Sequence, residues 1–242
     1  MNRRPIRAAQ IAVFATLLTL PIIGFGQDEA PQPDMDIEEL GDDRYRIGNI
    51  IVDKKNQSFT LGGKILHLGK PLEYLAVKTN GAKGYESLLE LETSASEFQL
   101  ACILVGLDDA NSVKPRWQFD ENDVEGQAVK ISVFWTDDGK RKVVRAANAL
   151  MRGDEPFDNH DWVYSGSLPS PQDGSLLAEM SGTLIGFVHD PMTVIEHQLG
   201  LGIGAYGSIL GNTDILPPIG TRMTLIVTAL PDPPGGGDSE SE

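Results

Sequence analysis

The sequence predicts an α+β fold, with an antiparallel or mixed β-sheet rich in hairpins and one or two packed helices. Three observations predict it. Short alternating apolar runs outnumber segments with helical spacing, and tight turns join most of these runs. No internal repeat of solenoid or propeller length is visible. Strands joined by tight turns favour an antiparallel or mixed sheet over alternating βαβ units.

The chain begins with the features of a secretory signal peptide. Arginines within the first seven residues precede an uncharged apolar run, Ile11–Leu20, of about half the length that spans a bilayer. The small-residue end Gly24-Phe25-Gly26 predicts cleavage near residue 26. We therefore expect a signal peptide at 1–26, export to the periplasm or the extracellular space, and no membrane insertion of the mature chain.

Beyond the signal, composition divides the chain into three parts. Residues 27–44 are rich in Asp, Glu and Pro and predict a disordered acidic leader. Residues 231–242 (PDPPGGGDSESE) predict a disordered acidic tail for the same reason. The remaining residues, 45–230, are enough for one folded domain with a sizeable core.

The first half of this domain predicts three strands and one helix. Ile47–Asp53, a polar turn and the run from Ser58 form a hairpin, and a further strand, Lys70–Lys78, ends at the turn dipeptide Asn80-Gly81. Ser94 and Glu97 match a helix-capping box, after which apolar residues recur near helical spacing until Gly106.

The second half predicts mainly strands. Gln127–Thr136 alternates well, and Asp137-Asp138-Gly139 turns it into the strand Lys140–Val144. Ala146–Met151 predicts a short helix. Further strands are expected at Trp162–Ser167, Ser175–Val188 and Thr221–Leu230.

Charge and cysteine content exclude several kinds of partner. The net charge is -15, and loss of the three signal-peptide arginines makes it -18. An acidic surface repels nucleic acid and anionic lipid, so neither is expected to bind. Cys102 is the only cysteine, which excludes an internal disulfide, an iron–sulfur cluster and a thiolate zinc site. Its apolar neighbours predict a buried, unreactive thiol, and we expect no cofactor.

Two motifs resemble ligand sites by letter only. Gly202-x-Gly204-x-x-Gly207 matches a dinucleotide fingerprint, but more glycines and a Pro-Pro pair surround it, which favours a loop. The acidic stretch Asp120–Gly126 departs from the EF-hand calcium pattern, because Val124 stands at a ligand position. A solvated loop is the simpler interpretation.

Two groups of residues are candidate sites. Asp158, His160 and Asp161 form the densest set of possible metal ligands, although adjacent side chains usually diverge and an acidic loop facing water is the simpler interpretation. The second group is a binding cleft with carboxylates and aromatic rings suited to a polar or sugar-like ligand. Its residues are Glu73, Tyr85, Glu86 and Trp162. Simple alternation on a half-buried strand is the competing explanation for Glu73.

An ordered set of segments resembles the YdjY-like domain family, found in exported proteins of planctomycetes and other bacteria. The segments are IIVDKKNQSFTLGGKI, PLEYLAVK, GYESLL, ILVGL, GQAVKISVFWTDDGK, DWVYSGS and LPPIGTRMTLIV. The resemblance implies an exported domain and brings no reaction, ligand or partner with it. Tyr85 and Gln99 stand where histidines are expected in the family, so any imidazole site of its relatives is absent from this chain.

The functional expectation is an exported, non-catalytic binding or interaction domain of the cell envelope. Its partner is an envelope protein or a small polar ligand. No nucleophile elbow and no His-Glu-x-x-His motif is present to indicate an enzyme. The alternative is a metal-dependent or acid–base hydrolase, whose site would be formed by Glu86, Asp158, His160 and His189. A purely structural role within a larger assembly also remains open.

Overall fold

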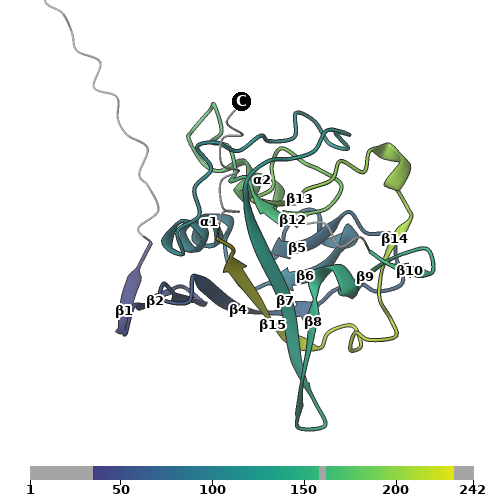
Figure 1. The fold of residues 1–242 in the computed structure, drawn as a ribbon, viewed down its shortest axis with the longest axis horizontal. Coiled ribbons are helices and arrows are strands. Elements are labelled where there is room, and N and C mark those ends of the chain that lie inside the picture. The colour runs from purple at the N-terminus through teal and green to yellow at the C-terminus, as the bar shows by residue number, and fades with distance from the viewer. Residues whose placement is uncertain (1–34, 158–161, 232–242) are drawn as a thin grey trace, which may run out of the picture. The chain divides into compact units, whose positions relative to one another are not determined.

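The computed structural model describes residues 35–157 and 162–231, and β-strands dominate this part of the chain (Figure 1). It contains fifteen strands but two α-helices, α1 (Ala95–Leu104) and α2 (Leu177–Ser181), of ten and five residues. The predicted α+β class is therefore wrong, since the described residues form a mostly β fold. No helix among them has the length and apolar content needed to cross a bilayer.

Eight of the strands close into a barrel. Neighbouring strands are antiparallel except for two parallel pairs, β12 with β13 and β5 with β6. A closed sheet buries its inner face within the ring and needs no helical layer to cover it, which is why the helix count stays low. The order around the ring is β4 (Ser58–Ile65), β15 (Arg222–Ala229), β7 (Gln127–Asp137), β11 (Trp162–Tyr164), β13 (Ile195–His197), β12 (Thr183–Gly186), β5 (Tyr74–Lys78) and β6 (Ser87–Leu91), which pairs again with β4.

A glycine permits the closing contact. The β4–β6 register pairs Gly63 with Leu91 and Ile65 with Leu89. A Cβ atom on Gly63 would lie 2.4 Å from the carbonyl oxygen of Glu90. Residue 63 therefore has to be glycine for the two strands to approach this closely.

The remaining strands extend from the ring or pair beside it. β1 (Ile37–Gly41), β2 (Arg44–Ile47) and β3 (Ile50–Asp53) continue the sheet from β4, and β8 (Lys140–Arg145) pairs with β7. A separate sheet contains β10 (Glu155–Pro156), β9 (Leu150–Arg152) and β14 (Ile209–Gly211). Because β1 pairs with β2, part of the segment expected to be a disordered leader forms a strand.

Several local predictions are confirmed. The β3–β4 and β7–β8 hairpins form, and Asp138 and Gly139 both adopt positive φ, 47° and 73°, in the second turn. Helix α1 begins with the expected capping box of Ser94 and Glu97. It ends where Gly106, with φ 96°, donates its N–H to the carbonyl of Ile103 at 3.0 Å.

Two segments differ from the local prediction. Ala146–Met151 forms a 3-10 helix, η2 (Ala146–Ala149), followed by strand β9. Ser175–Val188 contains helix α2 before strand β12, and Gly182 (φ 80°) separates them. The alternation in this segment predicted one strand because it cannot distinguish a buried helical turn from a buried strand. Two other 3-10 helices are η1 (Gly84–Glu86) and η3 (Ile203–Ala205).

Helix α1 packs its buried side against the sheet. Phe98 meets Phe59 of β4 edge to face, with ring centroids 5.3 Å apart. Cys102, one turn further along, is fully buried as expected, and burial raises the pKa of its thiol well above the ordinary value. The thiol is therefore protonated and protected from reagents.

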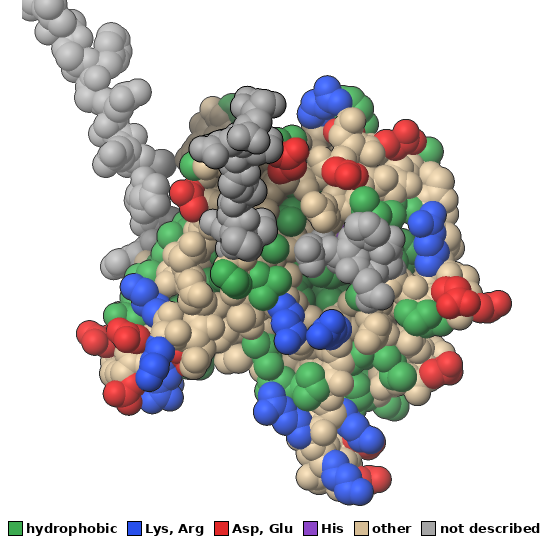
Figure 2. All heavy atoms as spheres, in the orientation of Figure 1, with side chains coloured by type: hydrophobic (Ala, Val, Ile, Leu, Met, Phe, Trp, Pro, Cys, Tyr) green, Lys and Arg blue, Asp and Glu red, His purple; other side chains and the backbone are tan. Residues whose placement is uncertain are grey.

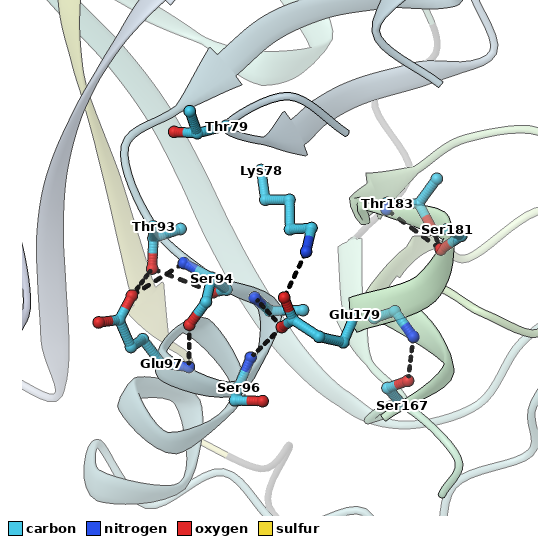
Figure 3. Close-up of polar contacts among 12 residues, drawn as sticks. Lys78, Thr79, Thr93, Ser94, Ser96, Glu97, Ser167, Glu179, Ser181 and Thr183 are labelled. Carbon is cyan, nitrogen blue, oxygen red and sulfur yellow. Dashed lines mark hydrogen bonds and ion pairs between the residues drawn. The ribbon is translucent and has the colours of Figure 1, made fainter. Parts of the chain in front are cut away.

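Glu179 of α2 joins both helices to the barrel (Figure 3). Its Oε2 accepts the N–H groups of Ala95 and Ser96 at the start of α1, at 2.8 and 3.2 Å. Its Oε1 accepts a hydrogen bond from Lys78 Nζ at the end of β5. Burial raises the pKa of Glu179, but these donors outweigh that effect and hold it below its usual value. The N-terminus of α1 is thus satisfied from within the chain.

Candidate functional site

Glu73 and Glu86 lie side by side at one end of the barrel. Glu73 immediately precedes β5, and Glu86 immediately precedes β6. These strands are parallel, with Tyr74 opposite Ser87, so the two glutamates lie next to each other at the same end of the barrel. The N–H of Glu73 donates to the carbonyl of Glu86 at 2.9 Å. The tertiary structure therefore places together two residues that the sequence analysis had proposed for one cleft.

The environment of Glu73 favours its neutral form. Glu73 is 5% exposed. Burial is the largest cause that raises the pKa of Glu73, and the nearby Glu86 carboxylate is the second. Lys83 and a hydrogen bond from Gln118 act in the opposite direction. Lys83 pairs with Glu86 at 2.7 Å and lies over the rings of Tyr74 and Tyr85, 5.8 and 5.9 Å from their centroids. Lys83 is thus the ion-pair partner of Glu86, and Glu73 is the carboxyl group whose pKa is raised.

Tyr74, the residue after Glu73, belongs to a buried polar network. Tyr74 donates its hydroxyl to Asp190 Oδ2 at 2.7 Å, and Met192 donates its N–H to Asp190 Oδ1 at 3.0 Å. Burial and the Asp190 charge raise the pKa of the Tyr74 phenol, so Tyr74 acts as a hydrogen-bond donor. Both Asp190 oxygens are occupied by donors from the protein.

The network ends at Glu196, which is fully buried on β13. Its Oε1 accepts the N–H of Asp190 at 3.0 Å and the hydroxyl of Thr193. Its Oε2 is buried without a hydrogen-bond partner among the described residues. Burial is the largest cause that raises the pKa of Glu196 to about 8, so at neutral pH this side chain carries a proton.

An exposed loop adjoins the two glutamates. Gln118 Nε2 donates to Glu73 Oε2 at 2.9 Å. The next residue, Phe119, adopts positive φ and donates its N–H to the carbonyls of Val188 and His189 at 3.2 and 3.0 Å. Asp120 accepts the N–H groups of Arg116 and Asn122, and these hydrogen bonds lower the pKa of Asp120 to about 2. The loop is therefore held in place by the Asp120 side chain and by hydrogen bonds to Glu73, Val188 and His189.

This loop borders a pocket of about 440 Å³, which residues 117–122 and Ile203 line. Two exposed apolar side chains belong to this lining, Trp117 (53% exposed) and Ile203 (65%). A third exposed side chain, Tyr206 (66%), lies beside the pocket. Tyr206 meets Phe119 edge to face at 6.1 Å, and the Arg116 guanidinium lies 4.6 Å from the Trp117 ring centroid. Large exposed aromatic groups beside a pocket are typical of a binding surface.

The glycine-rich segment supports this surface. Cβ atoms on Gly200 and Gly202 would lie 2.3 and 2.7 Å from atoms of Glu121, so only glycine lets the segment pack against the loop. Ile203–Ala205 forms a 3-10 turn, whereas a dinucleotide fingerprint needs a strand leading into an α-helix. The segment is a loop that borders the pocket.

Other proposed residues lie elsewhere. Trp162 is 4% exposed on β11 and packs edge to face against His197 at 5.4 Å. His189 is fully buried, and its ring nitrogens lie 3.1 and 2.7 Å from the carbonyl oxygens of Asp120 and His197. Each ring nitrogen therefore lies against a backbone carbonyl oxygen.

The proposed metal ligands Asp158, His160 and Asp161 lie outside the described residues. Within the described ranges, no group of three or more His, Cys, Asp or Glu side chains is arranged to hold a metal ion.

The sequence analysis did not assign Lys83, Trp117 or Gln118 to a site. None of them stands in a motif. Gln118 contacts Glu73 and Lys83 lies over Tyr74, whereas Trp117 lines the pocket because of the shape of its loop. An isolated tryptophan next to Arg116 in a polar loop was the single available signal for Trp117.

The two positions that depart from the expected histidines have different surroundings. Tyr85 is 61% exposed on η1, beside Lys83. Gln99 of α1 accepts the N–H of Ser167 at 2.7 Å, so its side chain has a structural contact.

Among curated proteins and among solved structures, none is significantly similar to this chain. A family model described as the YdjY domain matches residues 50–228. This range includes the barrel strands except the last residue of β15, together with the Glu73–Glu86 pair and the pocket beside Trp117. The match covers well over half of the chain and agrees with the resemblance in the sequence. This chain therefore belongs to the YdjY domain family.

Proposed function

We propose that this chain is an exported, non-catalytic binding domain of the cell envelope, and that it binds a small, polar, sugar-like ligand over Trp117. The basic and apolar N-terminal segment supports export. The proposed contact region consists of Trp117, Gln118 and the Glu73–Glu86 pair.

One observation carries the proposal. Trp117 is more than half exposed, and its neighbour Gln118 is anchored to the buried Glu73 carboxyl. An indole face stacks on the apolar face of a sugar ring, and a fixed amide with adjacent carboxyl groups can hydrogen-bond its hydroxyls. Because Gln118 is held in place before the ligand arrives, binding need not order the loop.

The rival hydrolase has less support. General acid–base work needs a titrating group within reach of a substrate. His189 has both ring nitrogens against backbone carbonyls, and Glu196 is fully buried. Glu86 is engaged by Lys83 at 2.7 Å. These arrangements favour binding over catalysis at the described residues.

Titration calorimetry with a panel of uncharged oligosaccharides tests the ligand. We expect a member of the panel to bind, and Trp117→Ala to weaken binding at least about tenfold, the worth of a stacked ring. Ile219→Ala, which removes another exposed apolar side chain (60% exposed), is the control and should bind as the parent does. Equal binding by both variants would refute the role of Trp117.

Export is tested separately. Protein recovered from the periplasm or medium of an expressing cell should have a mature N-terminus near residue 27. An intact N-terminus on protein that stays in the cytoplasm would contradict this part of the proposal.

A further inference from the structure

The β7–β8 hairpin has an unusual concentration of unpaired positive charge. Six consecutive residues of β8 include four cations, Lys140, Arg141, Lys142 and Arg145, in a chain of net charge -15. Elsewhere seven Lys and Arg side chains form ion pairs with described residues. None of the four on β8 does so among the described residues, and Arg141 instead lies over the Phe134 ring at 4.1 Å.

The hairpin also has a free edge. Among the described residues β8 pairs with β7 alone, and the two strands extend beyond the rest of the sheet (Figure 1). Asp137 and Lys140 flank the two-residue turn. The backbone N–H and C=O groups of alternate residues of β8 therefore bond to β7, and those of the residues between them point away from β7. The backbone N–H and C=O of Arg141 and Val143 are therefore available to another strand, and neither residue has a backbone bond outside the hairpin to any described residue.

Each face beside this edge carries two of the four cations, and a pocket lies on one of the faces. Arg141, Val143 and Arg145 lie on one face, and Val143 is 58% exposed. Lys and Arg side chains gather along the projecting hairpin in Figure 2. On the other face a pocket of about 560 Å³ lies between the hairpin and the loop 214–218. Its lining combines apolar residues, which include Trp135, Val144, Leu216 and two prolines, with the charged residues Asp137, Lys142 and Asp214.

We propose that β8 binds an extended peptide of a partner protein, in which acidic and apolar residues alternate, as an added β-strand. Side chains of a strand alternate between two faces. In the added strand one set would therefore lie beside Arg141 and Arg145, where acidic groups fit. The other set would face the pocket, where Trp135, Leu216 and the prolines can contact apolar side chains. Main-chain hydrogen bonds to Arg141 and Val143 would supply affinity, and the two faces would supply selectivity.

Charge argues for this occupant over a second copy of the chain. Pairing β8 with β8 of another copy would bring four cations against four, which is unfavourable. Cations on an edge strand also guard against aggregation. That protective role alone does not account for a pocket with Trp135 and Leu216 in its lining and an exposed valine at the same edge.

The test uses a capped eight-residue peptide alternating Glu and Val, titrated into the full mature chain. We expect saturable binding that weakens at least tenfold between 50 mM and 500 mM salt, because the contacts between charges are exposed. A peptide with the same composition in blocks, four Glu then four Val, should bind at least tenfold more weakly. If the block peptide or a short polyphosphate binds as well as the alternating peptide, the surface attracts anions in general and the proposal is wrong.

Two variants locate the site. Arg141→Glu with Arg145→Glu should weaken binding of the alternating peptide at least tenfold, whereas the matched double variant Lys54→Glu with Lys55→Glu, at another exposed turn, should bind as the parent does. Val143→Pro removes the outward N–H and should lose binding, since an edge strand tolerates proline on its free side. Unchanged binding by the double Arg variant would overturn the proposal.

Amide hydrogen exchange gives a readout that charge attraction alone does not produce. With peptide bound, the amides of Arg141 and Val143 should exchange at least tenfold more slowly. The amide of Lys142, which already bonds within the hairpin, should change little. Binding without protection of Arg141 and Val143 would rule out strand addition.

Discussion

Gln118 Nε2 donates a hydrogen bond of 2.9 Å to Glu73 Oε2, joining an exposed loop to a carboxyl group that is 5% exposed. The two residues are 45 positions apart in the chain. This bond fixes the loop that presents Trp117 and also stabilises the charged form of Glu73. Four predictions test this and three other contacts that hold the structure in place.

Gln118→Ala removes the only side-chain donor that the described residues offer to Glu73. The pKa of Glu73, already raised by burial, should rise further, and the free energy of unfolding at pH 7 should fall by about 1–2 kcal/mol. Urea denaturation measures the second effect, and carboxyl-carbon NMR titration measures the first. Gln172→Ala, at an exposed position, is the control; equal losses in both variants would contradict the prediction.

Glu196 makes stability depend on pH. Its folded pKa of about 8 lies above the ordinary value of 4.5, so its contribution is fully present below pH 4.5 and is lost as the pH rises toward 8. The slope reaches at most about 1.4 kcal/mol per pH unit for one proton. Denaturation from pH 4 to 9 should show this decline in the parent protein.

Glu196→Gln should flatten that decline, because an amide keeps an acceptor for Thr193 and Asp190 N–H and does not titrate. Glu125→Gln, at an exposed carboxylate, should leave the decline unchanged. A Glu196→Gln profile that parallels the parent between pH 4.5 and 8 would show that another group is responsible.

Glu179→Ala should destabilise the fold by about 1–3 kcal/mol, since the N–H groups of Ala95 and Ser96 lose their acceptor and Lys78 loses its partner. The folded pKa of Glu179 is lowered, so its contribution is present above pH 4.5 and disappears as the pH falls below that value. Thermal denaturation at pH 7 and pH 3 checks both statements. A difference between variant and parent that is as large at pH 3 as at pH 7 would argue against a charge effect.

Gly63→Ala tests barrel closure. The added Cβ would lie 2.4 Å from the Glu90 carbonyl oxygen, so β4 and β6 would have to separate. We expect a loss of about 1–3 kcal/mol or more in the free energy of unfolding. Gly69→Ala, where a Cβ meets nothing within 4 Å, should be close to neutral. Similar stability in the two variants would mean that the closing contact is not tight.

The sequence alone was sufficient where the determining residues are neighbours in the chain. Asp138 and Gly139 supply the positive φ angles of the β7–β8 turn, and Ser94 and Glu97 satisfy each other's backbone at the start of α1. The burial of Cys102 followed from its apolar neighbours. The family membership could also be recognised from ordered local segments.

The tertiary structure alone decided the closed barrel and the composition of the site. Closure pairs Gly63 with Leu91, and the polar network joins Tyr74 to Asp190 across 116 positions. Glu73 and Glu86 lie together because β5 and β6 run parallel, a choice that no local pattern encodes. Turns and caps depend on the backbone geometry of a few adjacent residues, whereas strand order depends on how the whole chain buries its apolar faces. The sequence therefore determined the hairpins and the ends of helix α1. Packing between distant segments determined the barrel and which side chains meet at its end.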